Sequence, residues 1–359
     1  MKKAEKEFFI ELCKFKALDT QKLNRLAKKY ATSAVLGELF FNRMQGVAYG
    51  VLKEGGILGK VNREFRNSLA AAYEQNKTRN ESFLNCVEYL SIILKKHESD
   101  YAMLKGAYLC GKYPVGYRTS NDIDLLVRPE YITAIGKTLT ENGFKQGNIR
   151  NGEFVPATRK EIIESKMTRG ETVPYINELN LPFLKYLEVD LNFSVDYKNS
   201  DDDTVNKIIS RAVTDDAIGI RMPDKQDFFI HLCCHLYKEA TTLPWVKMRR
   251  DMTLYKYLDI YMLLCEYTDD DISEIFKRAG ELGVADICAC VILWTCELMK
   301  YENNYAMKLS EIELTGKGEI LDTVVAPSEH KTYIYTEIDI VKRFFASDRS
   351  KLLIERKTK

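Results

Sequence analysis

A short apolar run that carries two aspartates constrains the fold of this 359-residue chain more than any other segment. The run reads Asp122-Ile123-Asp124-Leu125-Leu126-Val127. Because side chains alternate between the faces of a strand, Asp122 and Asp124 are expected on the same face, roughly 6–7 Å apart along the chain. Two carboxylates at the end of a buried strand are unfavourable unless a cation offsets their charge. A divalent metal that carries a phosphorylated substrate is the obvious candidate.

The segment before the acidic run supports this interpretation. A short apolar piece, Tyr101 to Leu104, leads into Lys105-Gly106-Ala107, which opens a predicted helix through Gly111. Glycine allows close approach of the backbone to a ligand, and the N–H groups at the start of a helix favour anions. We therefore predict that Lys105, Gly106 and Ala107 contact nucleotide phosphates.

Arg118 lies in the predicted loop that enters the acidic strand. A guanidinium there can bind a phosphate through two hydrogen bonds, and we assign Arg118 to nucleotide binding. The alternatives are a salt bridge from Arg118 to one of the aspartates and a surface position for Lys105.

A third carboxylate comes from the segment Leu187 to Phe193, in which apolar and polar side chains alternate as in a half-buried strand. Glu188, Asp190 and Asn192 share one face of this strand. If it lies beside the acidic strand, Asp190 completes a cluster of three carboxylates with Asp122 and Asp124. Two metal ions about 4 Å apart require such a cluster, with at least one bridging carboxylate. Glu188 is a weaker candidate ligand than Asp190.

These residues carry a resemblance to a known family. LKGAYLCGKYP and YRTSNDIDLLV, followed by LEVDLNFSV, resemble the uncharacterised nucleotidyltransferase family of the polymerase-beta-like nucleotidyltransferase superfamily. The superfamily pattern is a helix-opening Gly-Gly or Gly-Ser, then Asp-x-Asp on a strand, then a later Asp on a neighbouring strand. Gly106, Asp122, Asp124 and Asp190 match these positions. Ala107 replaces the serine of the Gly-Ser pair, and the spacing from Gly106 to Asp122 is longer than in minimal members.

The resemblance implies a Mg²⁺-dependent enzyme that moves a nucleoside monophosphate from an NTP, ATP by default, to an acceptor and releases pyrophosphate. Two Mg²⁺ ions are expected, with Mn²⁺ as an alternative. By this resemblance Asp122 and Asp124 bind both ions, and Asp190 binds the catalytic ion and acts as the base. The sequence does not identify the acceptor.

Other functions stay open at this point. One is a catalytically inert nucleotide-binding or scaffold protein on the same fold. Another is an RNA-directed transferase of toxin–antitoxin type, which would use the basic segment 341–359. Basic tails are usually solvated, so RNA is not the favoured partner. A kinase-type phosphotransferase could use the same metals.

Composition limits the partners and the compartment. The chain has 53 basic and 52 acidic residues, so its net charge of +1 creates no global field for nucleic acid. The N-terminal segment carries acids through its apolar part, unlike a signal peptide, and no apolar run is long enough to span a membrane. Nine cysteines without a signal peptide indicate reduced thiols. We expect a cytoplasmic protein without membrane contact.

The order of elements predicts an α+β fold: a nucleotidyltransferase core with a small mixed sheet, flanked by N- and C-terminal helical regions. We place an N-terminal helical region at 1–98, the core at 99–222, and a mainly helical domain with a strand-containing tail at 223–359. A helix is expected to start at Asn80 and a strand to cover Thr332 to Ile340. Residues 151–182 receive no firm structure and are candidates for a substrate-facing insertion.

The pair His231 and His235 also has helical spacing. Two histidines four residues apart share a helix face, as in zinc helices. However, Leu232 stands where a zinc protease needs its glutamate, and no third ligand is evident. We interpret both histidines as helix-packing residues.

Overall fold

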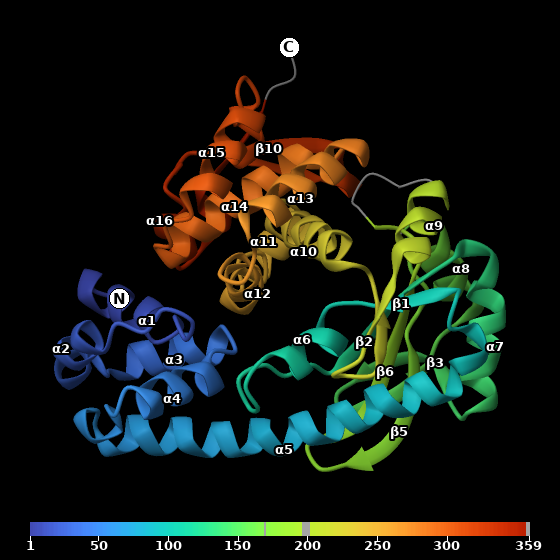
Figure 1. Cartoon of the computed structure of the whole chain (residues 1–359), viewed down its shortest axis with the longest axis horizontal. Helices are drawn as coiled ribbons and strands as arrows, with labels where there is room; N and C mark the ends of the chain where they lie inside the picture. The colour runs from blue at the N-terminus through green and yellow to red at the C-terminus, as the bar shows by residue number, and fades with distance from the viewer. Residues whose placement is uncertain (169, 196–201, 357–359) are drawn as a thin grey trace. The chain divides into compact units, whose positions relative to one another are not determined.

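The computed structural model describes residues 1–168, 170–195 and 202–356. Contacts divide the chain into two compact units, Met1–Ala70 with Phe229–Lys359, and Ala71–Phe228. The second unit contains a mixed sheet with helices, and helices dominate the first (Figure 1), so the predicted α+β class is confirmed. The predicted core at 99–222 lies inside the second unit, while the three-domain division stays a prediction.

The second unit is built around a six-stranded sheet in the order β1-β2-β6-β5-β3-β4. Its strands are β1 (Tyr101–Met103), β2 (Asp122–Val127), β3 (Lys145–Arg150), β4 (Glu153–Pro156), β5 (Tyr175–Leu181) and β6 (Leu184–Asn192). The pair β2 and β6 is parallel, and the other neighbours are antiparallel. The strand that carries Asp122 and Asp124 therefore lies beside the strand that carries Asp190, which meets the condition on which the three-carboxylate cluster depended.

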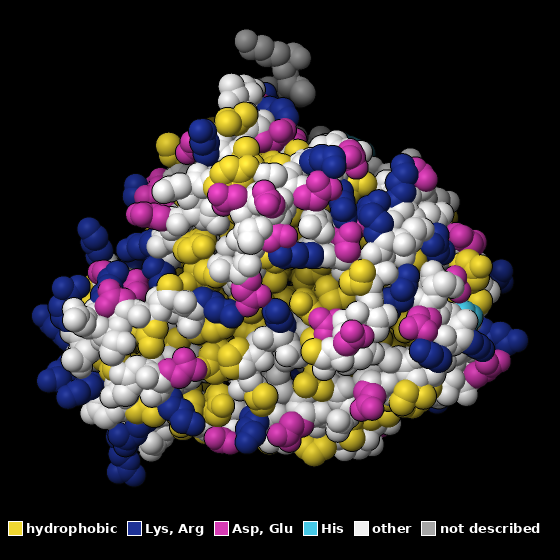
Figure 2. Space-filling model, in the orientation of Figure 1, with side chains coloured by type: hydrophobic (Ala, Val, Ile, Leu, Met, Phe, Trp, Pro, Cys, Tyr) yellow, Lys and Arg dark blue, Asp and Glu magenta, His cyan; other side chains and the backbone are white. Residues whose placement is uncertain are grey.

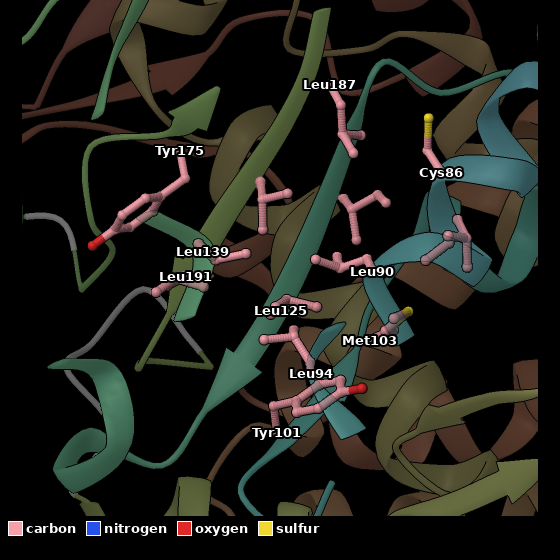
Figure 3. Close-up of a cluster of buried hydrophobic side chains, with 14 of the residues drawn as sticks. Cys86, Leu90, Leu94, Tyr101, Met103, Leu125, Leu139, Tyr175, Leu187 and Leu191 are labelled. Carbon is pink, nitrogen blue, oxygen red and sulfur yellow. The ribbon is translucent and has the colours of Figure 1, made fainter. Parts of the chain in front are cut away.

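One face of this sheet forms the main apolar core of the unit. Leu125 of β2 and Leu191 of β6 belong to this face, with Leu90 of α5 (Arg63–Ile93) and Leu139 of α7 (Ile132–Glu141) packed in the same cluster (Figure 3). Each large apolar side chain buried here contributes roughly 1.5–3 kcal/mol through removal of its surface from water. Because the odd-numbered residues of β2 take this core, the even-numbered ones face the other way.

The opposite face is partly covered by α9 (Asp202–Arg211). Leu126 at the end of β2 packs there with Leu104 and with Val205 and Ile208 of α9. Asp122 and Asp124 share the Leu126 side of the strand. The sequence thus places the two carboxylates on the less thickly covered face and the aliphatic residues in the core.

Two expectations about helices and loops in this region need correction. The helix expected to start at Asn80 starts at Arg63, after Asn62, whose side-chain oxygen accepts a hydrogen bond from the Phe65 amide at 2.9 Å. Asn80 lies inside α5, buried, with its amide group donating to the Cys110 carbonyl at 3.5 Å. Asn80 therefore makes a tertiary contact from inside the helix and does not start it.

The segment left without structure in the sequence, 151–182, is mostly regular. It contains β4, α8 (Arg159–Thr168) and β5. Both strands belong to the main sheet, and Thr158 and Glu161 exchange hydrogen bonds at the start of α8. A two-stranded hairpin of β7 (Val213–Asp215) and β8 (Ile220–Met222) and α6 (Gly106–Lys112) complete the unit.

The first unit is largely helical. Its helices are α1 (Lys3–Glu11), α2 (Thr20–Tyr30), α3 (Ser33–Phe41), α4 (Gln45–Glu54), α11 (Leu243–Lys247), α12 (Leu254–Leu264), α13 (Asp269–Glu281), α14 (Ala285–Met299), α15 (Asn304–Glu313) and α16 (Ile340–Phe344), and most of α10 (Lys225–Ala240). The predicted strand at Thr332 to Ile340 is too long. It corresponds to β10 (Lys331–Tyr335), whereas Ile340 starts a helix capped by Asp339, which accepts from the Lys342 amide at 2.9 Å.

The basic C-terminal segment is folded as far as the structure describes it, to Arg356; Lys357 and Lys359 lie outside the described residues. It includes α16 and β11 (Leu353–Glu355), which joins β10 and β9 (Thr323–Ala326) in a three-stranded sheet. Arg343 and Arg349 are only 1% and 2% exposed. Arg349 donates to both carboxylate oxygens of Asp251, at 2.7 and 2.6 Å, and Arg343 pairs with Asp322. Two arginines of the segment are thus structural, and for residues 341–356 the expectation of a solvated tail is wrong.

Surface charge agrees with the balanced composition. Lys and Arg side chains occur beside Asp and Glu side chains over the face seen in Figure 2. Among the described residues, no helix combines the length and apolarity needed to cross a membrane.

Candidate metal and nucleotide site

The backbone register brings the predicted carboxylates together. On the adjacent parallel strands β2 and β6, Asp122 is the partner of Glu188, and Asp124 is the partner of Asp190. Neighbouring strands lie about 4.8 Å apart, and residues in register point to the same face. Four carboxylates therefore occupy one face of two strands, which is how sequence alternation and strand pairing together create a local excess of negative charge.

Burial increases the energetic cost of the negative charge on these carboxylates. Asp124 is only 7% exposed, and Asp190 is half-buried. Burial raises the pKa of Asp190 well above its usual range, and the carboxylates of Asp124, Asp122 and Glu171 raise it further. The pKa of Glu188 is also raised, by burial and by Asp122. The site thus favours any cation that can offset these charges.

Glu171 is a residue that the sequence did not point to. It lies in a short bridge with Asn192 of β6, and the Thr172 amide donates to the Leu191 carbonyl at 2.9 Å. These backbone contacts bring Glu171 alongside the end of β6 that carries Asp190. Its only sequence signal is an acid in a segment interrupted by glycine and proline, which gives no strand register.

Lys105 provides positive charge at the site. Its ammonium lies 2.9 Å from Oδ1 of Asp124, and the amide of the preceding Leu104 donates to the Asp124 carbonyl at 2.9 Å. Burial alone would lower the pKa of Lys105, but Asp124, Asp122 and Asp190 outweigh it, so the pKa is raised and the side chain stays charged.

The backbone of Lys105 is strained. Its φ of 45° and ψ of −115° are unusual for a residue with a side chain. Such conformations cost roughly 1–3 kcal/mol and are concentrated at functional sites. The turn between β1 and α6 thus holds the Lys105 side chain against the carboxylates at a cost in stability.

Of the other predicted nucleotide contacts, Gly106 and Ala107 belong to this turn, and Arg118 lies in the loop before β2. The Ala107 amide donates to the Leu104 carbonyl at 3.2 Å, so this predicted phosphate donor is engaged within the turn. Gly106 begins α6 and is packed against Ser120. Arg118 is 7% exposed, and its guanidinium donates to the Thr119 carbonyl in the loop before β2.

That loop is held by α5. The Asn76 side chain donates to the Gly116 carbonyl at 3.3 Å, and Arg79 donates to the Ser120 carbonyl at 3.4 Å and to the side chain of Asn121. These contacts fix the chain directly before the acidic strand.

The donor set fits a hard divalent cation, because carboxylate oxygens are the ligands that Mg²⁺ prefers and four carboxylates share this face of β2 and β6. The side chains do not converge as they stand, however. Within residues 1–168, 170–195 and 202–356, no group of three or more His, Cys, Asp or Glu side chains is arranged so that it could hold a metal ion. In this arrangement Asp124 is bonded to the ammonium of Lys105.

The histidine pair belongs to the first unit. The rings of His231 and His235 are stacked with centroids 6.5 Å apart, and Nε2 of His235 lies 3.5 Å from Oε1 of Glu239. The ring packing and the contact with Glu239 on the same helix agree with the interpretation of these histidines as structural residues.

Comparison with known proteins gives one match. A family model described as "Uncharacterised nucleotidyltransferase" matches residues 32–300, which include every predicted site residue. No curated protein matches the chain. No solved structure matches it either. The family resemblance found in the sequence is thereby confirmed.

Proposed function

Because the chain belongs to the uncharacterised nucleotidyltransferase family, we propose that it transfers a nucleoside monophosphate from an NTP to an acceptor, with Mg²⁺ as cofactor and release of pyrophosphate. The observation that carries this proposal is the pairing of Asp124 with Asp190 on adjacent parallel strands, with Asp122 two residues away on the same face. A nucleotide substrate follows from the family, whereas the base and the acceptor are open.

In the proposed reaction, an acceptor hydroxyl attacks the α-phosphorus of the NTP. The bond from that phosphorus to the oxygen bridging to the β-phosphate breaks, and pyrophosphate leaves. Mg²⁺, held by Asp122, Asp124 and Asp190, would supply charge stabilisation for the phosphates and lower the pKa of the attacking hydroxyl. Mn²⁺ is the expected substitute.

Asp190 is the proposed acceptor of the proton from the attacking hydroxyl. This role rests on the register that places Asp190 beside Asp124 and on the ability of a carboxylate to accept a proton.

Lys105 has two roles in this proposal. Its ammonium pairs with Asp124 at 2.9 Å. Asp124 would serve as a ligand of Mg²⁺ only when freed from this pair, and Lys105 would then be available to neutralise the phosphates. Arg118 and the backbone of Gly106 are the further proposed phosphate contacts, whereas the predicted donor of Ala107 is already bonded to the Leu104 carbonyl.

A calorimetric titration with non-hydrolysable NTPs and Mg²⁺ tests the site. Wild type should bind one of the NTPs only with Mg²⁺, and Asp124→Asn should lose this binding while keeping its circular dichroism spectrum. Asp216→Asn, an exposed aspartate in the β7–β8 turn, is the matched control and should bind like wild type. Binding that is unchanged in Asp124→Asn would contradict the proposed site.

A second measurement tests the reaction class. With NTP labelled at the α-phosphate, the label should move to the acceptor fraction of a cell extract while unlabelled pyrophosphate appears. Release of nucleoside diphosphate with the α-label would instead indicate a kinase-type transfer. Tight Mg²⁺-dependent binding with neither product would favour the inert nucleotide-binding protein.

A further inference from the structure

Ser120 connects the turn at the start of α6 with the acidic strand. It is 8% exposed, and its hydroxyl donates to Oδ1 of Asp122 at 2.9 Å. Its carbonyl accepts a hydrogen bond from Arg79 at 3.4 Å. The residue is therefore held from the α5 side through its backbone and bonded to a predicted metal ligand through its side chain.

Gly106 faces Ser120 from the other side. A Cβ added to Gly106 would lie 2.6 Å from the Cβ of Ser120 and closer still to its hydroxyl oxygen. Real side chains do not approach this closely, and Ser120 has little freedom to move because α5 holds its backbone. The requirement for glycine at position 106 is thus explained by Ser120 without reference to a ligand.

The chemistry of the hydroxyl limits what Ser120 can do. A serine has one O–H donor, and Ser120 uses it on Asp122. It cannot donate the same proton to a phosphate. A bond to Oδ1 fixes the plane of the carboxylate and directs Oδ2 to a defined point, as hydrogen-bonded partners of metal ligands do.

We propose that Ser120 is a positioning residue for Asp122, and that Gly106 serves this function by leaving room for Ser120. The inference rests on the proposed function, since positioning matters for the metal that Asp122 would bind. It adds two residues with a shared structural role to the three aspartates.

Binding of Mn²⁺ alone, followed by electron paramagnetic resonance, is the first test. Ser120→Ala should weaken Mn²⁺ binding about 10–100-fold, the range typical for loss of a partner that orients a ligand. Ser120→Thr keeps the hydroxyl and should retain most of the affinity. Ser91→Ala, which removes a half-buried hydroxyl bonded at 3.0 Å to the Val87 carbonyl in the same unit, is the control and should bind like wild type.

A second pair of variants separates positioning from folding. Gly106→Ala should lose both thermal stability and Mn²⁺ affinity, because its Cβ displaces Ser120. The double variant Gly106→Ala with Ser120→Gly removes the clash and should regain stability, but not Mn²⁺ affinity. Recovery of affinity in the double variant would overturn the proposal, because the hydroxyl would then be dispensable.

Crystal structures of metal-free Ser120→Ala and Ser120→Thr test, independently of metal binding, whether Ser120 orients the Asp122 carboxylate. The Asp122 carboxylate should change its orientation in the alanine variant and keep it in the threonine variant. If wild type binds no Mn²⁺, the metal part of the proposed function fails, while these structures still test Ser120. An unchanged Asp122 in Ser120→Ala would overturn the positioning role.

Discussion

The ammonium of Lys105 lies 2.9 Å from Oδ1 of Asp124, and Lys105 holds this position with a positive φ of 45°. Two opposing contributions therefore act on the same residue. The ion pair offsets part of the negative charge on β2 and β6, whereas the backbone conformation costs stability. Substitutions that separate the two contributions are available.

Replacing Lys105 by Ala or by Gly removes the ammonium in both cases, but only Gly relieves the backbone. We expect Lys105→Gly to be more stable than Lys105→Ala by about 1 kcal/mol in urea unfolding, because a Cβ disfavours this region of φ and ψ. At Lys137, an exposed position inside α7, the order should reverse, with Ala more stable than Gly by about 0.5–1 kcal/mol. If Lys105→Ala is instead more stable than Lys105→Gly, as expected for the two variants at Lys137, the backbone of Lys105 is not strained.

Removal of the Lys105 ammonium should also change the response to Mg²⁺. The carboxylates then have no ammonium to compete with a divalent ion, so a given Mg²⁺ concentration should raise the melting temperature of Lys105→Gly more than that of wild type. Differential scanning calorimetry with and without Mg²⁺ measures this difference. Lys137→Gly should respond like wild type, and a smaller response in Lys105→Gly would mean that the lysine assists binding.

Asp190 predicts a pH dependence of stability. Burial and the neighbouring carboxylates raise its pKa in the folded state well above the unfolded value of about 3.9. Between these two pKa values the folded state binds more protons than the unfolded state, so stability falls as pH rises through this window. Asp190→Asn should lack this fall and gain stability relative to wild type as pH increases.

Urea unfolding of both proteins from about pH 4 to pH 8, without divalent metal, measures the difference. Asp216→Asn serves as the control, since this aspartate is exposed, and its difference from wild type should stay flat with pH. An equally flat difference for Asp190→Asn would show that neither burial nor the neighbouring carboxylates raise the pKa of Asp190 in the folded state.

The sequence predicted strands and the faces of their side chains correctly where apolar and polar residues alternate. Alternation predicted the strands of Asp122 and Asp190 and the shared face of Asp122 and Asp124, because period-2 patterns determine which side chains point together. Whether the two strands pair, and with Asp124 opposite Asp190, depends on tertiary packing, and only the structure settled it.

The residues missed in the sequence were those without a local pattern. Glu171 reaches the site through a bridge to Asn192, and Ser120 through a close approach to Gly106, so each depends on a partner distant in sequence. The expected helix start at Asn80 failed for the same reason, since a polar residue inside a helix resembles a cap unless its partner is known. Charge composition alone likewise did not reveal that Arg349 is buried.

The buried pair of Arg349 and Asp251 gives a last prediction, about stability of the first unit. Asp251 is fully buried and Arg349 is 2% exposed, with two hydrogen bonds between them. Arg349→Met leaves a buried carboxylate without its partner and should lower the free energy of unfolding by about 3–5 kcal/mol. The exposed pair of Lys331 and Glu355, at 2.8 Å, is the control, and Lys331→Met should change the free energy of unfolding much less than Arg349→Met.

A double variant distinguishes the cost of an unpaired buried carboxylate from the cost of lost side-chain packing. Arg349→Met combined with Asp251→Leu removes both charges, so the large cost of an unpaired carboxylate disappears and the double variant should be more stable than Arg349→Met alone. If the two substitutions instead add, the destabilisation comes from packing of the arginine side chain and not from its charge. Guanidinium unfolding of the four proteins of this cycle gives the coupling free energy directly.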